Sequence, residues 1–526
     1  AADGYARASG KLGVCVATSG PGATNLVTGV ANAYMDSVPL LILSGQVPSQ
    51  LIGTDAFQET DILGMTLGIV KHSYLVSDVN QLPAIIEQAI NLAISGRPGP
   101  VWIDLPKDIL LQPIIQAQQL PDISSEENEQ TIECEQIKLA HELIAKASKP
   151  LIYSGGGVMA AEAVKSFRCF AETTGFPQVQ TLKGIGNAGS QHNLSLGMLG
   201  MHGSRAANEA VSECDLLIAV GVRFDDRATG KPESFAPAAK IIHLDADSSE
   251  FHKLKRADCY LRGSLDEMLK AITPEHPVTD ISAWRQYCQQ LKASKSFHPT
   301  PNPDEQAPID GPEFLSLLSD IKPDQCIICS DVGQHQMWVA QYMTFPHPRN
   351  HLSSGGLGPM GFGLPAAIGA QFANPKQAVV NVTGDGSFMM NLQELATIKR
   401  YRLPVKIIIL DNQRLGMVRQ QQELFYGERY SEIDLSDNPE FVNVSQAFGI
   451  HALKIDARHQ MRRAIETMFA YAGSMLLHVK ISEETNVWPI VKPGAGNHEM
   501  IDPFILTGNH PSVSPTTAAN SELKRQ

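Results

Sequence analysis

The sequence lacks the features of a membrane protein, a nucleic-acid-binding protein or a disulfide-rich protein. No apolar run approaches the roughly 20 residues that a helix needs to cross a bilayer. Basic residues do not outnumber acidic ones, and the formal net charge of −13 disfavours nucleic acid and anionic membranes as general partners. The eight cysteines are scattered over 526 residues, so we expect reduced thiols in a cytoplasmic protein.

Length and patterning predict an α/β protein with three doubly wound domains. A chain of 526 residues is long enough for about three domains. Short apolar runs alternate with helical patterns, an order typical of mainly parallel sheets covered by helices. This predicts domains at 1–115, 134–290 and 309–495, separated by polar linkers at 116–133 and 298–308. Most of the polar tail, 496–526, is expected to be disordered.

One stretch, residues 377–420, has the pattern of a strand, a glycine turn, a helix and a second strand. The strands are expected at 378–382 and 405–410, both apolar and rich in β-branched residues. Between them, Gly384 and Gly386 are expected to form a sharp turn in which only glycine lets the backbone approach a ligand. Such a unit brings the carboxyl ends of two parallel strands together, which is where open α/β sheets bind ligands.

Asp385 and Asn412 follow these two strands and are predicted to lie at neighbouring strand ends. A carboxylate, an amide oxygen and a backbone carbonyl suit Mg²⁺, which completes its octahedron with phosphate and water. The helix after Gly386 would present its N-terminal amides to a diphosphate. A lone Gly-Asp-Gly is more often only a turn. The second oxygen donor, at the end of the next predicted strand, makes a metal site the favoured interpretation.

The segment GDGSFMMNLQELATIKRYRLPVKIIILDNQ resembles the thiamine-diphosphate motif, in which GDG is followed by an asparagine at this distance. The surrounding chain is similar to the large catalytic subunit of acetolactate synthase (acetohydroxyacid synthase), nearest to the bacterial isozyme II type, from the first residue to about residue 500. The resemblance implies the architecture of thiamine-diphosphate enzymes. It also implies Asp385, Asn412 and the backbone carbonyl of Arg414 as Mg²⁺ ligands. The family often has asparagine at Asp411, which is not the ligand of the pair.

The resemblance further implies which residues contact thiamine diphosphate. TSGPGATN, GQVP, IGTDAFQET and RPGPVWIDLPKD resemble signatures of the family's pyrimidine-binding domain, here 1–115. On this match the cofactor contacts Thr18, Pro21, Gly22 and Asn25 at its aminopyrimidine, and Gln334, His335, Gly384, Gly386 and Ser387 around its diphosphate. Met360 is placed under the thiazolium. The third domain, 309–495, would bind the diphosphate and Mg²⁺.

Four further residues are implied at the reacting centre. Phe57, Gln58 and Lys107 are expected to line the place where substrate reacts, although Lys107 alone would be interpreted as a solvated loop lysine. Arg227 is expected to hold the carboxylate of the second substrate, a task that suits guanidinium geometry.

The glutamate that activates the cofactor in this family precedes AADGYARA and would fall upstream of Ala1. That helix has no capping residue before it, so we expect a chain cut at its N-terminus. A targeting segment is therefore not assessable. Asp3 comes too late in the motif to replace the glutamate and is expected to be a solvated helix residue.

The middle domain is implied to bind FAD. Its expected strands all end in glycine or a polar residue, so a nucleotide could lie across them, although helix packing also explains a lone Gly-Gly-Gly. The resemblance implies contacts from Arg97, Gly155, Gly156, Gly157, Thr181, Leu182, Met201, His202, Arg223, Asp225, Asp245 and Ala246. Asp245, at a strand end, is the expected ribose-side acid. Lys183 stands where the family usually has methionine.

These similarities imply a carboligase. It would condense two pyruvates to 2-acetolactate and CO₂, or pyruvate and 2-ketobutyrate to 2-aceto-2-hydroxybutyrate, the first common step of branched-chain amino-acid synthesis. FAD would be structural. A homodimer or tetramer with a regulatory small subunit is implied. Two alternatives remain open: another thiamine-diphosphate 2-keto-acid decarboxylase or carboligase, and a truncated copy that lacks the glutamate and does no chemistry.

One departure from the family bears on the choice of substrate. Gln421, in GMVRQQQELFYGERY, stands where related synthases mostly carry tryptophan, whose indole packs against the alkyl group of the second keto acid. A methylene group is discriminated by only about 1–3 kcal/mol in an apolar pocket. Loss of this apolar surface predicts a weaker preference for 2-ketobutyrate over pyruvate.

Overall fold

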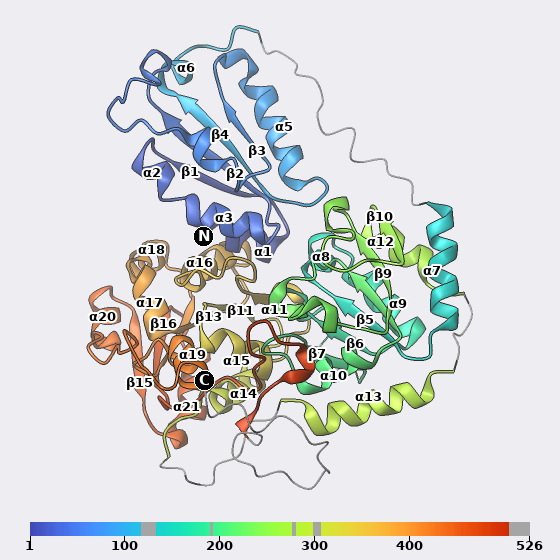
Figure 1. Cartoon of the computed structure of the whole chain (residues 1–526). Coiled ribbons are helices and arrows are strands. Elements are labelled where there is room, and N and C mark those ends of the chain that lie inside the picture. The colour runs from blue at the N-terminus through green and yellow to red at the C-terminus, as the bar shows by residue number, and fades with distance from the viewer. Residues whose placement is uncertain (117–132, 190–192, 276–279, 298–303, 305–306, 504–526) are drawn as a thin grey trace.

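The computed structural model describes residues 1–116, 133–189, 193–275, 280–297, 304 and 307–503. In these ranges three separate sheets are each flanked by helices, and all pairings between named strands are parallel (Figure 1). The predicted α/β class with mainly parallel sheets is therefore confirmed. Within the same ranges, no helix combines the length and the apolar character that crossing a bilayer requires.

The first sheet has the order β1-β2-β4-β3. Its elements are β1 (Gly13–Ala17), β2 (Leu40–Gln46), β3 (His72–Leu75) and β4 (Pro100–Pro106), with helices α1 (Ala2–Ser9), α2 (Pro21–Thr24), α3 (Val27–Met35), α4 (Ile62–Thr66), α5 (Leu82–Ile94) and α6 (Lys107–Leu110). Strand β3 has no alternating apolar pattern, and the sequence analysis did not predict it. It pairs along β4 and contributes half-exposed or exposed residues.

The middle sheet has the order β10-β9-β8-β5-β6-β7. Its strands are β5 (Pro150–Ser154), β6 (Gln178–Gln180), β7 (Ser195–Met198), β8 (Leu216–Val220), β9 (Lys240–Asp245) and β10 (Cys259–Arg262). The helices are α7 (Cys134–Lys146), α8 (Gly156–Ala160), α9 (Val164–Thr174), α10 (Arg205–Glu213), α11 (Asp226–Thr229), α12 (Leu265–Ile272) and α13 (Ser282–Lys295). The strand order reverses between β5 and β8, which places a crevice at their carboxyl ends.

The third sheet has the order β12-β11-β13-β14-β16-β15. Its strands are β11 (Ile327–Ser330), β12 (His351–Leu352), β13 (Val379–Gly384), β14 (Lys406–Asp411), β15 (His451–Ile455) and β16 (Met475–Lys480). The helices are α14 (Gly311–Ile321), α15 (Gln334–Tyr342), α16 (Gly363–Ala373), α17 (Asp385–Asn391), α18 (Leu395–Tyr401), α19 (Gly416–Phe425), α20 (Phe441–Ala447) and α21 (Met461–Ala470). Every residue of β13 and β14 is buried, which explains their continuous apolar runs.

The first and third domains meet where α1 packs on α16 (Figure 1). A Cβ on Gly4 would lie 2.2 Å from the carbonyl oxygen of Ala366, and one on Gly369 would lie 1.9 Å from that of Ala1. Neither space could hold a side chain, so glycine is what allows the two helix backbones to touch. This contact fixes the first domain against α16 of the third domain.

The start of the predicted tail packs against the middle domain. Residues 496–502 are held in place: Asn497 is buried and donates to the carbonyl of Ala228 at 2.8 Å, and Arg205 pairs with Asp502 at 2.5 Å. The polar composition of this segment hid the buried amide contact. The rest of the tail, and most of both predicted linkers, lie outside the described residues.

Candidate cofactor sites

A small cavity of about 80 Å³ lies at the carboxyl ends of β13 and β14. Residues Gly384 and Leu410 are paired across the two strands, and Asp385 and Asn412 directly follow the ends of β13 and β14. Both of these polar residues line the cavity, together with Arg414. The predicted neighbouring strand ends are therefore confirmed as geometry, because parallel strands in register must end at one edge.

The predicted sharp turn at Gly384 and Gly386 is wrong. Gly384 ends β13 with φ of −87°, and helix α17 begins at once with Asp385. Glycine is required here because there is little room for a side chain, not because the backbone turns. A Cβ on Gly386 would lie 3.1 Å from the side chains of both Leu415 and Leu435. The motif thus lets neighbouring loops close over the first turn of a buried helix.

Asp385 sits in a setting that favours a cation. Burial, followed by the nearby carboxylate of Asp411, raises the pKa of Asp385 well above its usual value. Asp411 is itself held by His478 at 2.7 Å and Lys480 at 3.0 Å. Asn438, which the sequence analysis did not identify, donates to Asp385 Oδ2 at 3.1 Å. A divalent cation beside Asp385 would offset the repulsion between the two carboxylates, so the residues present fit Mg²⁺.

The other predicted metal ligands lie in one short turn after β14. Asn412 donates to Gln334 Oε1 at 3.3 Å, and its own Oδ1 accepts from the Arg414 amide at 3.2 Å. Gln413 between them has φ of 54°, in the left-handed region. Buried Gln420 then accepts from Gln334 at 3.1 Å. Buried amide side chains therefore hold this turn in place. Their contacts can be seen only in the tertiary structure.

The diphosphate-side residues surround the same cavity. His335, Gln334 and Ser387 all line it. Burial lowers the pKa of His335 to about 3, so the ring is neutral near pH 7, and its buried Nε2 has no hydrogen-bond partner among the described residues. Such an atom is a fitting contact for a phosphate oxygen or its bound water. A volume of about 80 Å³ holds a metal ion and a phosphate group, but not a whole thiamine.

Met360 lies between the small cavity and a second, much larger one. It lines both, and a Cβ on Gly386 would lie 3.5 Å from its Cε. The loop that carries it is fixed by Asp331, which accepts from the amides of Gly361 at 2.9 Å and Gly363 at 2.8 Å. Asp331 directly follows β11. This position at a strand end is the sequence feature from which its role could have been predicted.

The large cavity has a volume of about 930 Å³ and lies mainly against the middle domain. It is lined by each residue that the family resemblance implied for FAD: Arg97, Gly155, Gly156, Gly157, Thr181, Leu182, Met201, His202, Arg223, Asp225, Asp245 and Ala246. Arg227, Lys183 and Gln421 line it as well. Its volume is near the upper end of the range for ligand pockets, about 300–1,000 Å³, and therefore fits a dinucleotide.

Backbone and charge in this cavity also fit a dinucleotide. A Cβ on Gly155 would lie 2.4 Å from the Gly221 carbonyl oxygen, so β5 and β8 meet here backbone to backbone. The buried Nδ1 of His202 has no partner in the described chain. Arg97 reaches across from the first domain and pairs with Asp247 at 3.1 Å. A polar cofactor could form hydrogen bonds with such unpaired buried polar atoms and with the backbone exposed at the glycines.

The structure does not bring the first-domain residues predicted for the aminopyrimidine and for the reacting centre to either cavity. Neither cavity is lined by Thr18, Pro21, Gly22, Asn25, Phe57, Gln58 or Lys107. Phe57 is 89% exposed, and Lys107 lies on the surface after β4. These residues follow the carboxyl ends of β1, β2 and β4 in the first sheet. Within one chain, therefore, the predicted reacting centre is not assembled.

The expectation for Asp3 is wrong. Its side chain is only 14% exposed, pairs with Arg7 and accepts from Asn32 at 3.1 Å. It is a structural acid that holds α1 against α3. Arg7 is the i+4 neighbour of Asp3 in the same helix, but the burial of the pair depends on α3, which the helical pattern alone does not reveal.

Comparison with known families places these sites in a class. Three thiamine pyrophosphate enzyme models match in order: the N-terminal TPP binding domain at 1–65, the central domain at 137–272 and the C-terminal TPP binding domain at 331–479. The last match spans both strands and helices of the small cavity, and the central one spans most of the large cavity's lining. The fold and the sites thus define a thiamine pyrophosphate enzyme.

Relatives narrow the class. The chain is 52% identical over 502 residues to acetolactate synthase isozyme 2 large subunit of Escherichia coli (strain K12), covering 95% of this chain and 90% of the relative. It is 43% identical to the isozyme 1 large subunit of the same organism, with 95% of this chain and 88% of the relative covered. It is 45% identical to chloroplastic acetolactate synthase of Arabidopsis thaliana, with 95% of this chain and 76% of the relative covered. The chain belongs to the acetolactate synthase large-subunit family.

Proposed function

We propose that this chain condenses two 2-keto acids, joining two pyruvates to give 2-acetolactate and CO₂, or pyruvate and 2-ketobutyrate to give 2-aceto-2-hydroxybutyrate. The observation that carries the proposal is the meeting of the two cavities at Met360. One has the donor set for Mg²⁺ and a diphosphate, and the other has the lining expected for FAD. Family membership supports the same reaction, in branched-chain amino-acid synthesis, while the scattered cysteines support a cytoplasmic location.

The third-domain residues are proposed to hold the thiamine cofactor. Asp385, Asn412 and the Arg414 carbonyl would ligate Mg²⁺, while Gln334, His335, Gly384, Gly386 and Ser387 would surround the diphosphate. When bound, thiamine diphosphate supplies the electron sink that decarboxylation of a 2-keto acid requires. Met360 would keep the cofactor bent, because a bulky side chain beneath the ring excludes the extended form. Arg227 would orient the carboxylate of the acceptor substrate in the large cavity.

The first-domain residues are proposed to act in a second copy. Phe57, Gln58 and Lys107 are exposed and line neither cavity within one chain. A homodimer in which the first domain of one subunit, with its aminopyrimidine contacts Thr18, Pro21, Gly22 and Asn25, faces the third domain of the other would complete the site. The relatives are named large subunits, which supports a small regulatory partner.

The test of this function is product formation by the complete reading frame that contains the chain. With thiamine diphosphate, Mg²⁺ and FAD present, we expect pyruvate to be converted to 2-acetolactate with one CO₂ released per product. Acetaldehyde as the main product would support a decarboxylase instead. No turnover by a folded protein that binds all three cofactors would support the inactive copy.

A pH dependence of FAD binding is expected from Asp245. Burial, then the neighbouring acids Glu250 and Asp247, raises the pKa of Asp245 to about 7. Ribose hydroxyl groups would donate to its carboxylate form, so bound FAD favours deprotonation. Affinity should be greatest above the pKa and should fall as pH drops through it, by about tenfold from pH 8 to pH 6. Fluorescence titration of FAD at each pH measures this change.

Two variants control this experiment. Asp245→Asn should bind FAD with little dependence on pH, because the titrating group is gone. Asp226→Asn, altered at a side chain that is 81% exposed and lines neither cavity, should keep the wild-type profile. An unchanged slope in Asp245→Asn would show that another group is responsible.

A further inference from the structure

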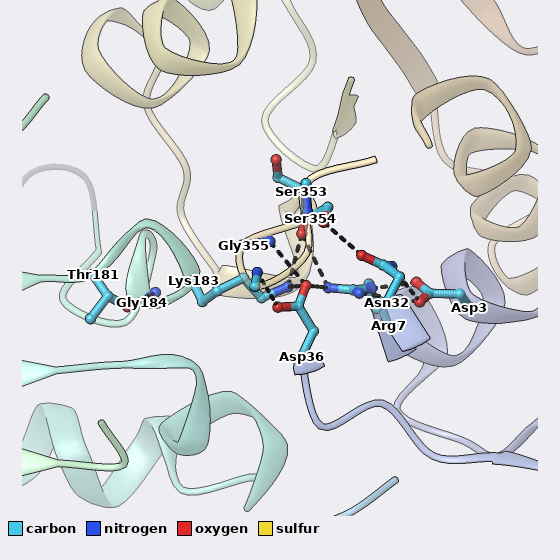
Figure 2. A network of polar contacts seen from close by, with 12 residues as sticks. Asp3, Arg7, Asn32, Asp36, Thr181, Lys183, Gly184, Ser353, Ser354 and Gly355 are labelled. Atoms are coloured by element: carbon cyan, nitrogen blue, oxygen red, sulfur yellow. Dashed lines mark hydrogen bonds and ion pairs between the residues drawn. The ribbon is translucent and has the colours of Figure 1, made fainter. Parts of the chain in front are cut away.

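A buried ion network joins the three domains beside the wall of the large cavity (Figure 2). Asp36, at the C-terminal end of α3, has a side chain only 1% exposed, and its Oδ2 lies 2.8 Å from Arg7 Nη1 and 3.3 Å from Lys183 Nζ. Both cations also donate to the carbonyl of Ser353, at 3.1 Å and 2.9 Å respectively. Elements of all three domains therefore meet at one buried carboxylate.

The same carboxylate fixes the loop that separates the two cavities. The amide of Gly355 donates to Asp36 Oδ2 at 3.0 Å, and that of Gly356 donates to Oδ1 at 2.8 Å. Burial would raise the pKa of Asp36, but the two cations and a loop amide lower it below the usual range. Asp36 is thus an ionised acceptor, and hydrogen bonds to ionised acceptors are the stronger ones.

The start of this loop has a second anchor at Ser354. Ser354 donates to Asn32 Oδ1 at 2.6 Å and accepts from the Gly358 amide at 2.8 Å. The residues between these contacts and those of Asp331 include Met360, which lines both cavities together with Val332, Gly333 and Met417. The position of Met360 therefore depends on how firmly the first domain holds the start of its loop.

Lys183 connects Asp36 to the lining of the large cavity. It lies in the short 3₁₀ helix η3 (Leu182–Gly184), next to cavity-lining Thr181, and its own side chain lines the cavity. A Cβ on Gly156, at the start of α8, would lie 3.1 Å from Lys183 Cβ. A ligand of the large cavity that contacts α8 or η3 would therefore fix the backbone of Lys183, whose ammonium group contacts Asp36.

We infer that Lys183 and Asp36 are positioning residues that couple the two cavities, so that FAD in the large cavity and thiamine diphosphate in the small one each tighten the binding of the other. This inference rests on the proposed function, because it takes the occupants from there. FAD would order η3 and seat the ammonium on Asp36. The loop before Met360 would then already be fixed when thiamine diphosphate binds. The conformational entropy lost on binding would therefore be smaller.

The measurement is the coupling factor between the two cofactors. The dissociation constant of FAD is determined by fluorescence quenching with and without saturating thiamine diphosphate and Mg²⁺, on the complete catalytic chain. We expect at least about fivefold tighter FAD binding in their presence, the lower end of typical coupling factors. Calorimetric titration of thiamine diphosphate with and without FAD must give the same factor, because linkage is reciprocal.

The decisive variant is Lys183→Met, which keeps an unbranched side chain of similar length and leaves Arg7 to compensate Asp36. Its coupling factor should fall to about one. The matched control is Lys406→Met. Lys406 is also buried and donates to two carbonyl groups, of Tyr471 and Gly473, but it lies at the amino end of β14, opposite the cavities. This control should keep the wild-type factor.

The outcomes separate the inference from the proposed function. A wild-type chain that binds neither cofactor overturns the proposed function. Binding of both without coupling, or an unchanged factor in Lys183→Met, overturns the inference alone. A variant with weaker FAD binding and wild-type coupling assigns Lys183 a purely structural role and also overturns it. If Lys183→Met does not fold, as judged by circular dichroism, Asp36→Asn is expected to lose the coupling and decides in its place.

Discussion

Replacing Asp385 with asparagine should abolish detectable turnover and weaken thiamine diphosphate binding by at least about 100-fold, since residues that merely support metal ligands are already worth about 10- to 100-fold. Asparagine has nearly the same shape but supplies only a neutral oxygen. Mg²⁺ in this cavity would lose the one carboxylate among its proposed protein ligands. Calorimetric titration with thiamine diphosphate at fixed Mg²⁺ measures the loss.

Stability distinguishes this result from simple unfolding. In the absence of cofactors, burial and Asp411 raise the pKa of Asp385 to about 8, so near pH 7 its carboxyl group is mostly protonated and the amide replaces an uncharged group. The cofactor-free variant should therefore unfold at the same temperature as wild type or a higher one. Asp320→Asn, an exposed change of the same kind, should alter neither binding nor stability. Thiamine diphosphate binding within threefold of wild type in Asp385→Asn would remove Asp385 from the metal site.

Much of this fold was predictable because buried parallel strands have a simple signature. The apolar runs that became β13 and β14 are buried on both faces, and polar residues follow at once where each strand ends. Asp385 and Asn412 could therefore be paired from their strands alone. Strand β3 was missed because its four residues, His-Ser-Tyr-Leu, are half-exposed or exposed and carry no apolar alternation.

The supporting contacts were not predictable, because they join residues that are distant in sequence. Asn438 reaches Asp385 across 53 positions, and Arg7 reaches Ser353 across 346. No local pattern distinguishes such a residue from a solvated one. Asp3 shows this most plainly, since its helix is correctly predicted and its environment is not. Residue types and strand ends indicate the chemistry, whereas the packing of three domains decides which polar side chains are buried.

The second large effect is expected from Gln421→Trp. Gln421 lies in α19 one turn after Met417, and both line the large cavity together with Arg227. An indole here would add apolar surface next to the proposed place of the acceptor's alkyl group. 2-Ketobutyrate differs from pyruvate by one methylene group, which an apolar contact discriminates by about 1–3 kcal/mol. We expect the preference for 2-ketobutyrate over pyruvate as acceptor to rise about tenfold.

Competition between the two keto acids measures this preference directly, as the ratio of 2-aceto-2-hydroxybutyrate to 2-acetolactate at known substrate concentrations. The ratio is independent of the fraction of active enzyme, so partial loss of folding does not disturb it. Gln289→Trp, on an exposed position of α13, is the matched control and should leave the ratio unchanged. Gln421→Leu should give an intermediate ratio, because it supplies apolar surface without the breadth of the indole. Equal ratios in wild type and Gln421→Trp would mean that this side chain does not contact the acceptor.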